Sequence, residues 1–313
     1  MNKLNTFTST GSKLLNHPDL CKSLQYKKAI PITLQIAPTS ICNLNCSFCS
    51  NSKRKKHESL DIEKIKYLLT DLMKIGLKSV EITGGGDPTM YSHINSLIQF
   101  SYNMGLEVAM ITNGVLLQEK IQQKSLDMLK WLRVSINSIE YVDEIDIPEI
   151  KGTLGFSLCM HHEMINKSDF DIKLLNHVKK YNPSYVRVVP DCLPGEDEEN
   201  LRQTCKKIVS FYGKPFFFQD KIFTTPDRCW WNYIKPFLLH DEYVYPCSSV
   251  VLNSGAEGVF HHKYKWVHMS QLKDIYDSEI VPYPIDGCNR CVFSKQNNDI
   301  DSIINPTGME NFI

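Results

Sequence analysis

The chain has 313 residues, of which 42% are hydrophobic and 22% are charged, with 35 basic side chains against 35 acidic ones. This balance excludes the strongly basic footprint of a dedicated nucleic-acid or membrane-surface protein, although a local basic patch would be compatible with it. No stretch reaches the ~20 apolar residues that cross a bilayer, and the polar residues 1–11 do not resemble a signal peptide. We therefore expect a cytoplasmic protein with no membrane partner.

Short apolar runs alternate with amphipathic helical patterns between residues 31 and 212. Strands are predicted at Thr33–Pro38, Ser79–Thr83, Glu107–Thr112, Leu132–Asn137, Leu154–Met160 and Tyr185–Pro190. Helices are predicted at Ile62–Ile75, Ile94–Met104, Leu117–Leu129, Phe170–Lys180 and Leu201–Tyr212. Ser59 and Asp61 are candidate caps for the first of these helices. The alternation predicts an α/β fold with a parallel sheet, and a curved or partly closed barrel fits it.

The pattern changes after about Gly195. Residues 221–313 carry many aromatic side chains and cysteines without a strand–helix period, although a short hairpin is predicted within Asp241–Leu252 and a helix at Ser270–Asp277. We therefore divide the chain into an N-terminal extension (1–30), a strand–helix domain (31–220) and a small C-terminal domain (221–313).

The chain has eleven cysteines, an odd number and a high one for a reducing compartment. Disulfides rarely persist there, so metal binding is the better explanation. Cys42, Cys46 and Cys49 lie within eight residues, directly after the first predicted strand. Three thiolates suit an iron–sulfur cluster with one open iron, or a zinc site that borrows a fourth ligand such as His57.

The Cys-x3-Cys-x2-Cys spacing, with Phe48 before the last cysteine, resembles the signature of the radical S-adenosylmethionine (SAM) superfamily. The sequence Gly84-Gly85-Gly86-Asp87-Pro88, after the second predicted strand, resembles the family's glycine-rich segment, with Asp87 in place of the more usual Glu. The resemblance implies a partial (β/α)6 TIM-like barrel and a [4Fe–4S] cluster held by the three cysteines. In the family, the reduced cluster cleaves SAM to methionine and a 5′-deoxyadenosyl radical, which abstracts a hydrogen atom from the substrate.

The same resemblance assigns cofactor-binding roles along the chain. It places Phe48 near the SAM adenine and residues 84–87 near the SAM amino group. It also makes Asn113, Ser135 and Asn137 candidates; for the last two, polar strand ends or a helix cap remain equally good readings. These segments all follow predicted strands, and the carboxyl ends of parallel strands meet at the active-site mouth of a barrel. A zinc knuckle predicts no such convergence.

A second group of cysteines lies in the C-terminal part: Cys229, Cys247, Cys288 and Cys291. Four thiolates suit a closed zinc site or a second [4Fe–4S] cluster. Their order around the predicted hairpin and helix resembles the twitch domain, a short SPASM-like auxiliary-cluster domain of some radical SAM enzymes. A fully ligated cluster has no open iron, so it should pass electrons. This arrangement resembles that of a secondary-alcohol dehydrogenase acting on an aminocyclitol, which implies a two-electron oxidation.

Candidate substrate-contacting residues follow the sixth predicted strand. Arg187 could reach a SAM carboxylate or a substrate anion, although an ion pair on the outer face of the strand is equally compatible. Asp191 and Cys192 could exchange a proton or a hydrogen atom, although Asp191 could instead cap the loop. Cys159, His161 and His162 are weaker candidates. The basic run at 53–56 is either a solvated face or a patch that attracts an anionic substrate.

The sequence thus predicts a radical SAM enzyme of the oxidoreductase type that acts on a small polar metabolite or nucleoside with an electron donor such as flavodoxin or ferredoxin. Modification of a peptide or of a nucleic-acid base is the first alternative, and nucleic acid is not excluded as a partner. A non-enzymatic zinc or iron–sulfur binding module is the second.

Overall fold

The computed structural model describes residues 6–166, 169–193, 198–253, 262–309 and 311. Across these residues runs one sheet of ten strands in the order β10-β9-β8-β1-β2-β3-β4-β5-β6-β7. The strands are β1 (Thr33–Ile36), β2 (Ser79–Ile82), β3 (Glu107–Thr112), β4 (Leu129–Ser135), β5 (Thr153–Met160), β6 (Tyr185–Pro190), β7 (Phe216–Phe218), β8 (Phe237–Leu238), β9 (Tyr243–Tyr245) and β10 (Val267–His268). Neighbours from β8 through β7 pair in parallel, whereas β9 pairs antiparallel with both β8 and β10. The predicted α/β fold with a mainly parallel sheet is therefore confirmed.

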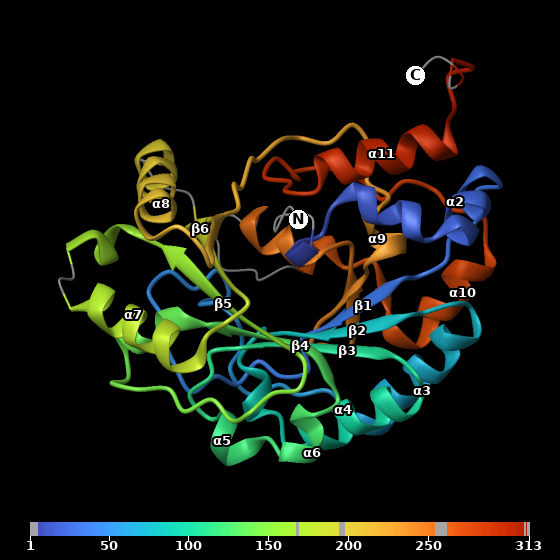
Figure 1. The fold of residues 1–313 in the computed structure, drawn as a ribbon. Helices are drawn as coiled ribbons and strands as arrows, with labels where there is room; N and C mark the ends of the chain where they lie inside the picture. The colour runs from blue at the N-terminus through green and yellow to red at the C-terminus, as the bar shows by residue number, and fades with distance from the viewer. Residues whose placement is uncertain (1–5, 167–168, 194–197, 254–261, 310, 312–313) are drawn as a thin grey trace.

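Helices cover both sides of the sheet. The α-helices are α2 (Pro18–Gln25), α3 (Ile62–Lys74), α4 (Ile94–Asn103), α5 (Leu117–Lys120), α6 (Gln123–Leu126), α7 (Phe170–Tyr181), α8 (Glu198–Tyr212), α9 (Trp231–Ile234), α10 (Leu272–Asp277) and α11 (Ser294–Ile304). Figure 1 shows α3 to α7 along one side of the sheet. On the other side, α11 packs against α2 and against the 3-10 helix η1 (Gly11–Asn16), so the two ends of the described chain lie together (Figure 1).

Helix α3 illustrates how sequence signals produce these elements. Its buried side chains recur at helical spacing, namely Ile65, Leu68, Leu69 and Leu72. Asp61 caps its first turn and accepts hydrogen bonds from Glu63 N at 2.8 Å and Lys64 N at 3.1 Å. Such a cap contributes about 1 kcal/mol. Ser59, the other candidate cap, instead pairs with the Thr39 hydroxyl at 2.8 Å.

The predicted helix at Leu117–Leu129 is wrong in its length. The chain forms α5 and α6 and then enters β4 at Leu129. Asn95 holds the break between the two short helices: its Oδ1 accepts from Gln122 N at 2.9 Å and its Nδ2 donates to Lys120 O at 2.8 Å. A side chain from α4 therefore satisfies the backbone groups that a continuous helix would have paired.

The C-terminal part of the chain continues the same sheet. Strand β8 pairs with β1, with Gln35 opposite Phe237 and Ile36 opposite Leu238. Strands from both sides of the predicted boundary at 220/221 thus belong to one sheet, and the three-domain description stays a prediction. Among the described residues, no helix combines the length and the apolar character that a membrane span requires.

Candidate active site

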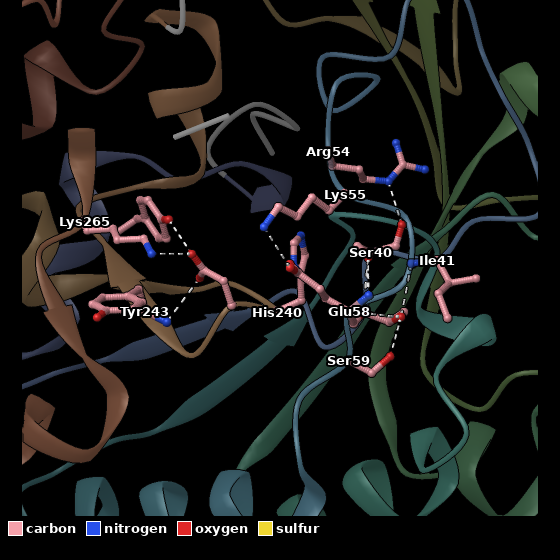
Figure 2. A network of polar contacts seen from close by, with 12 residues as sticks. Ser40, Ile41, Arg54, Lys55, Glu58, Ser59, His240, Tyr243 and Lys265 are labelled. Carbon is pink, nitrogen blue, oxygen red and sulfur yellow. Dashed lines mark hydrogen bonds and ion pairs between the residues drawn. The ribbon is translucent and has the colours of Figure 1, made fainter. Parts of the chain in front are cut away.

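The loop after β1 carries Cys42, Cys46 and Cys49, all half-buried. A hydrogen-bonded clasp fixes its base. Ser40 N donates to Glu58 O at 2.9 Å, and Glu58 N donates to the Ser40 hydroxyl at 2.9 Å. Figure 2 shows the clasp and its continuation to the segment after β8, where Glu58 Oε2 lies 2.9 Å from His240 Nδ1. The cysteine loop is therefore anchored on both sides.

Arg54 lies beneath the loop, although the basic run at 53–56 predicted a solvated face or an exposed patch. Its side chain is only 7% exposed, whereas Lys53, Lys55 and Lys56 are exposed. Arg54 Nε donates to Ser40 O at 2.7 Å (Figure 2). One terminal nitrogen of Arg54 lies 3.9 Å from Cys49 Sγ. The guanidinium thus holds the loop closed and puts a positive charge beside a predicted iron ligand.

Two thiols of this loop, Cys42 and Cys46, have raised pKa values. Burial raises the pKa of Cys42, and burial together with the neighbouring Cys49 raises the pKa of Cys46 to about 11. A cation bound among them would supply the missing positive charge and release the protons. The donor set therefore suits a metal centre.

The glycine-rich segment lies directly against the base of the cysteine loop. Gly86 N donates to Thr39 O, and Asp87 N donates to Ile41 O, both at 2.8 Å. A Cβ at Gly86 would collide with the Ile41 carbonyl, so only glycine permits this approach. The sequence predicted that the two segments would meet, and these backbone bonds join them.

Asp87 is the centre of a buried network. Only 3% of this residue is exposed, and its carboxylate accepts from the Thr89 hydroxyl at 2.6 Å, the Thr112 hydroxyl at 2.9 Å and Asn113 N at 2.6 Å. Asn113 Nδ2 in turn donates to Asn43 Oδ1 at 2.7 Å, beside Cys42. The carboxylate of Asp87 thus positions the end of β3 against the cysteine loop.

Phe48 stacks on His161, with ring centroids 4.6 Å apart. His161 Nε2 lies 3.0 Å from Glu140 Oε1, and both side chains are buried. The sequence offered His161 only as a weak candidate and did not single out Glu140, which is one of several acidic residues between the fourth and fifth strands. Its function near the predicted adenine position stays a prediction.

Asn137 bridges the ends of β4 and β5. Its Nδ2 donates to Cys159 O at 2.8 Å, and its Oδ1 accepts from Cys159 N at 2.7 Å. These bonds favour the structural reading of Asn137. Ser135 lies opposite Ser157, which lies opposite Arg187, so the three form a row across β4, β5 and β6.

The residues after β6 lie at the same end of the sheet. Asp191 Oδ1 accepts from Leu193 N at 3.0 Å, the loop cap that was its alternative reading. Burial raises the pKa of Asp191 and of Cys192. Arg187 lines a cavity on the inner face, where it donates to the Ser157 hydroxyl at 2.7 Å. The outer-face ion pair considered for Arg187 is therefore wrong.

The four C-terminal cysteines meet around one small cavity of about 10 Å³, lined mainly by apolar side chains. Backbone bonds bring their segments together: Cys291 N donates to Thr224 O at 2.9 Å, and Tyr283 N donates to Cys229 O at 2.9 Å. Burial raises the pKa of Cys229 to about 12. In the described residues, no group of three or more His, Cys, Asp or Glu side chains is arranged around a single ion. A four-iron cluster is larger than this cavity, so the cavity would have to widen to hold one.

Arg290, between Cys288 and Cys291, joins this second cysteine group to the loop after β6 and to α8. It donates to Cys192 O at 3.2 Å and to Glu198 Oε1 at 2.8 Å. The C-terminal cysteine segment therefore touches the loop after β6, at the end of the sheet where the predicted site residues gather.

Several proteins are similar in sequence to part of this chain. Over 156 residues, the chain is 24% identical to an S-adenosylmethionine-dependent nucleotide dehydratase of Thermoplasmatales archaeon (strain ISO4-H5), covering 48% of this chain and 56% of that protein. Over 113 residues it is 32% identical to a GTP 3′,8-cyclase of Aquifex aeolicus, covering 34% of this chain and 35% of the cyclase. The chain thus spans between a third and a little over half of these relatives.

A solved structure has a similar fold. SuiB of Streptococcus suis, bound to SAM, aligns with a TM-score of 0.57 at 16% identity and covers 92% of this chain and 76% of SuiB. Residues 36–208, more than half of the chain, match the family model of the Radical SAM superfamily. This match includes the cysteine loop, the glycine-rich segment and the ends of β3 to β6, and the chain belongs to the radical SAM superfamily.

Proposed function

We propose that this protein is a radical SAM enzyme that oxidises a small polar metabolite or nucleoside with the help of two [4Fe–4S] clusters. The observation that carries the proposal is the hydrogen-bonded junction of the cysteine loop, the glycine-rich segment and Asn113 at one end of a parallel sheet. Strands β1 to β6 would form the partial (β/α)6 barrel, and residues 221–313 the twitch-like domain.

The residues of the junction suit this chemistry. Cys42, Cys46 and Cys49 would hold three irons and leave one open for SAM. When bound and reduced, the cluster supplies one electron that cleaves SAM to methionine and a 5′-deoxyadenosyl radical. The backbone of 84–86 can approach the SAM amino group closely, because these residues carry no side chain. The Asp87 network keeps that backbone rigid.

The substrate class is supported by the similar sequences. The nucleotide dehydratase and the GTP 3′,8-cyclases act on nucleotides by their names, and they match 48% and 34% of this chain, respectively. A peptide substrate is the alternative, since SuiB is also known bound to a precursor peptide. At 15% identity that likeness concerns the fold alone.

Substrate pools distinguish these classes. Protein reconstituted anaerobically with iron and sulfide would be incubated with SAM, with reduced flavodoxin or dithionite, and with one substrate pool at a time. The first pool contains nucleosides and nucleotides, the second aminocyclitols, the third peptides and the fourth oligonucleotides. We expect the first or second pool to raise the rate of 5′-deoxyadenosine formation, and a deuterated substrate to transfer deuterium into it. Stimulation by peptides or by an oligonucleotide alone would contradict the proposed substrate class.

The second cluster is expected to accept the electron that leaves after hydrogen abstraction. We predict that replacing Cys288 and Cys291 with alanine removes about four irons per chain and suppresses oxidised product, while SAM cleavage continues. Iron analysis and product chromatography measure the two effects. The matched control is Cys205→Ala, since Cys205 is also buried but lies in α8. Loss of one zinc in place of iron would show a closed zinc site.

Arg54 is expected to raise the reduction potential of the first cluster. Its guanidinium lies 3.9 Å from Cys49 Sγ, and positive charge near the sulfurs favours the reduced form. We predict that Arg54→Met lowers the midpoint potential by tens of millivolts, on the order of one charged hydrogen bond. Redox titration followed by electron paramagnetic resonance measures this, with Lys55→Met as control. An unchanged midpoint potential in Arg54→Met would contradict the proposed effect of Arg54 on the cluster.

A further inference from the structure

A large cavity of about 1280 Å³ opens on the inner face of the sheet, and Trp231 and Phe293 line both this cavity and the small one around the C-terminal cysteines. The N-terminal residues 6–14 and the strands β1 to β6 contribute to its walls. Eight lysines and arginines line it against four carboxylates, although the whole chain is balanced in charge. The excess positive charge is therefore concentrated in one enclosed space.

Three cations in this cavity, Arg187, Arg133 and Lys221, form no ion pair with a carboxylate among the described residues. Arg187 donates to the Ser157 hydroxyl at 2.7 Å and to Gln219 Oε1 at 3.1 Å. Arg133 donates to the Tyr185 hydroxyl at 2.9 Å and, by its other arm, to a backbone carbonyl. Within the described part of the chain, neither arginine nor Lys221 comes within 4.0 Å of a carboxylate oxygen.

In the same cavity, Lys235 is a cation that does have a carboxylate partner, Glu81. Lys235 Nζ lies 2.8 Å from Glu81 Oε2, and both side chains are largely buried. Enclosed charges without such a partner are costly, and they persist where a ligand supplies the opposite charge. Burial and the nearby Arg187 lower the pKa of Lys221 to about 8, as expected for a lysine that lacks an anion.

Packing along β5 and β6 fixes the positions of Arg133 and Arg187 in the cavity. Gly155 lies opposite Tyr185, and a Cβ there would collide with the Tyr185 ring, so glycine lets the ring lie across β5 toward Arg133. Phe7 stacks on the other side of this ring at 4.1 Å. Arg187 stands one row nearer the carboxyl ends, level with Ser157. Side chains of the neighbouring strands thus hold both guanidinium groups in place.

We propose that Arg187 and Lys221, with Arg133 behind them, bind the phosphate group of the substrate inside this cavity. A planar guanidinium and an ammonium match the oxygens and double charge of a phosphate better than those of a single carboxylate. The cavity exceeds the usual 300–1,000 Å³ of small-molecule sites, so a nucleotide-sized molecule fits. This inference rests on the proposed function, because it assigns part of the substrate of that enzyme.

Isothermal titration of the reconstituted protein with inorganic pyrophosphate tests the proposal. We expect binding to the wild type, and at least tenfold weaker binding to Arg187→Met and to Lys221→Met. The control is Lys130→Met at the rim, where Lys130 is exposed and pairs with Glu107 at 2.9 Å; its affinity should stay within twofold. No binding to the wild type, or equal losses in all three variants, would overturn the proposal. If acetate bound as tightly as pyrophosphate, the site would be one for carboxylates, and the phosphate assignment would be overturned.

The pH dependence gives a second readout. Lys221 is charged below its pKa, so pyrophosphate affinity should fall as the pH rises through about 8, and Lys221→Arg should reduce this loss. The groups that face Lys221 are Arg187, Arg133 and the thiols of Cys159 and Cys192; burial lowers the pKa of Arg187 to about 9 and raises the pKa values of both thiols. An identical pH profile in wild type and Lys221→Arg would overturn the role of Lys221.

Failure of this proposal can be told apart from failure of the proposed function. If the wild type forms 5′-deoxyadenosine but binds no pyrophosphate, the phosphate site is wrong and the enzyme assignment stands. If it binds pyrophosphate in the expected pattern but never cleaves SAM, the phosphate site stands and the enzyme assignment is wrong.

Discussion

Alanine at Cys42, Cys46 and Cys49 together is expected to abolish the formation of 5′-deoxyadenosine and to remove about four irons per chain. No other described cysteine lies in this loop, so the open iron that would bind SAM is lost with these thiolates. The C-terminal group should keep about four irons, because its ligands lie on other segments. Chromatography of the SAM products and iron analysis of the purified variant measure the two effects.

A matched variant controls for the loss of a thiol as such. Cys21 is half-buried in α2 and its thiol contacts Leu14 O at 3.5 Å, outside both cysteine groups. Cys21→Ala should keep both the iron content and SAM cleavage. The assignment would be contradicted if the triple variant still cleaved SAM, or if it retained all of its iron.

Replacing Asp87 with alanine is expected to destabilise the fold by about 3–5 kcal/mol. Deleting the buried carboxylate would leave the Thr112 hydroxyl and the Thr89 and Asn113 amides without their acceptor, each at a cost of about 1–3 kcal/mol. The same bonds join β3 to the cysteine loop, so iron incorporation should fall as well. Urea unfolding of the metal-free protein under reducing conditions measures the stability.

The control for Asp87 is Glu149→Ala, which removes an exposed carboxylate. Its free energy of unfolding should change by less than about 0.5 kcal/mol. A loss below about 1 kcal/mol in Asp87→Ala would mean that water or neighbouring groups replace the carboxylate, and the network would then not be what rigidifies the glycine-rich segment.

The strand–helix alternation could be predicted because each central strand is a buried apolar run and each long helix repeats its apolar positions. The break between α5 and α6 could not, since it depends on a side chain of α4, Asn95, that is far away in the sequence. Strand β7 has three residues, too few to show a period. Helix α11 was missed because its sequence is polar and buries only Asn297, Ile300 and Ile304.

The cysteines could be proposed as metal ligands from the sequence because each group contains cysteines only a few residues apart. The supporting residues were not: Arg54 is one of four consecutive basic residues, and nothing in the sequence separates the buried one from its exposed neighbours. Likewise, His161 and Glu140 come from different strand ends, and only the fold brings them together against Phe48. Local spacing predicts ligands, whereas long-range packing decides which charged groups surround them.

The central claim is that this chain carries two iron–sulfur clusters, one of which cleaves SAM. Its most direct test is the iron, sulfide and zinc content of the anaerobically reconstituted wild type, with 5′-deoxyadenosine measured with and without reductant. The account predicts about eight irons and eight sulfides per chain, with 5′-deoxyadenosine formed only under reduction. Zinc in place of iron, with no cleavage of SAM, would contradict it.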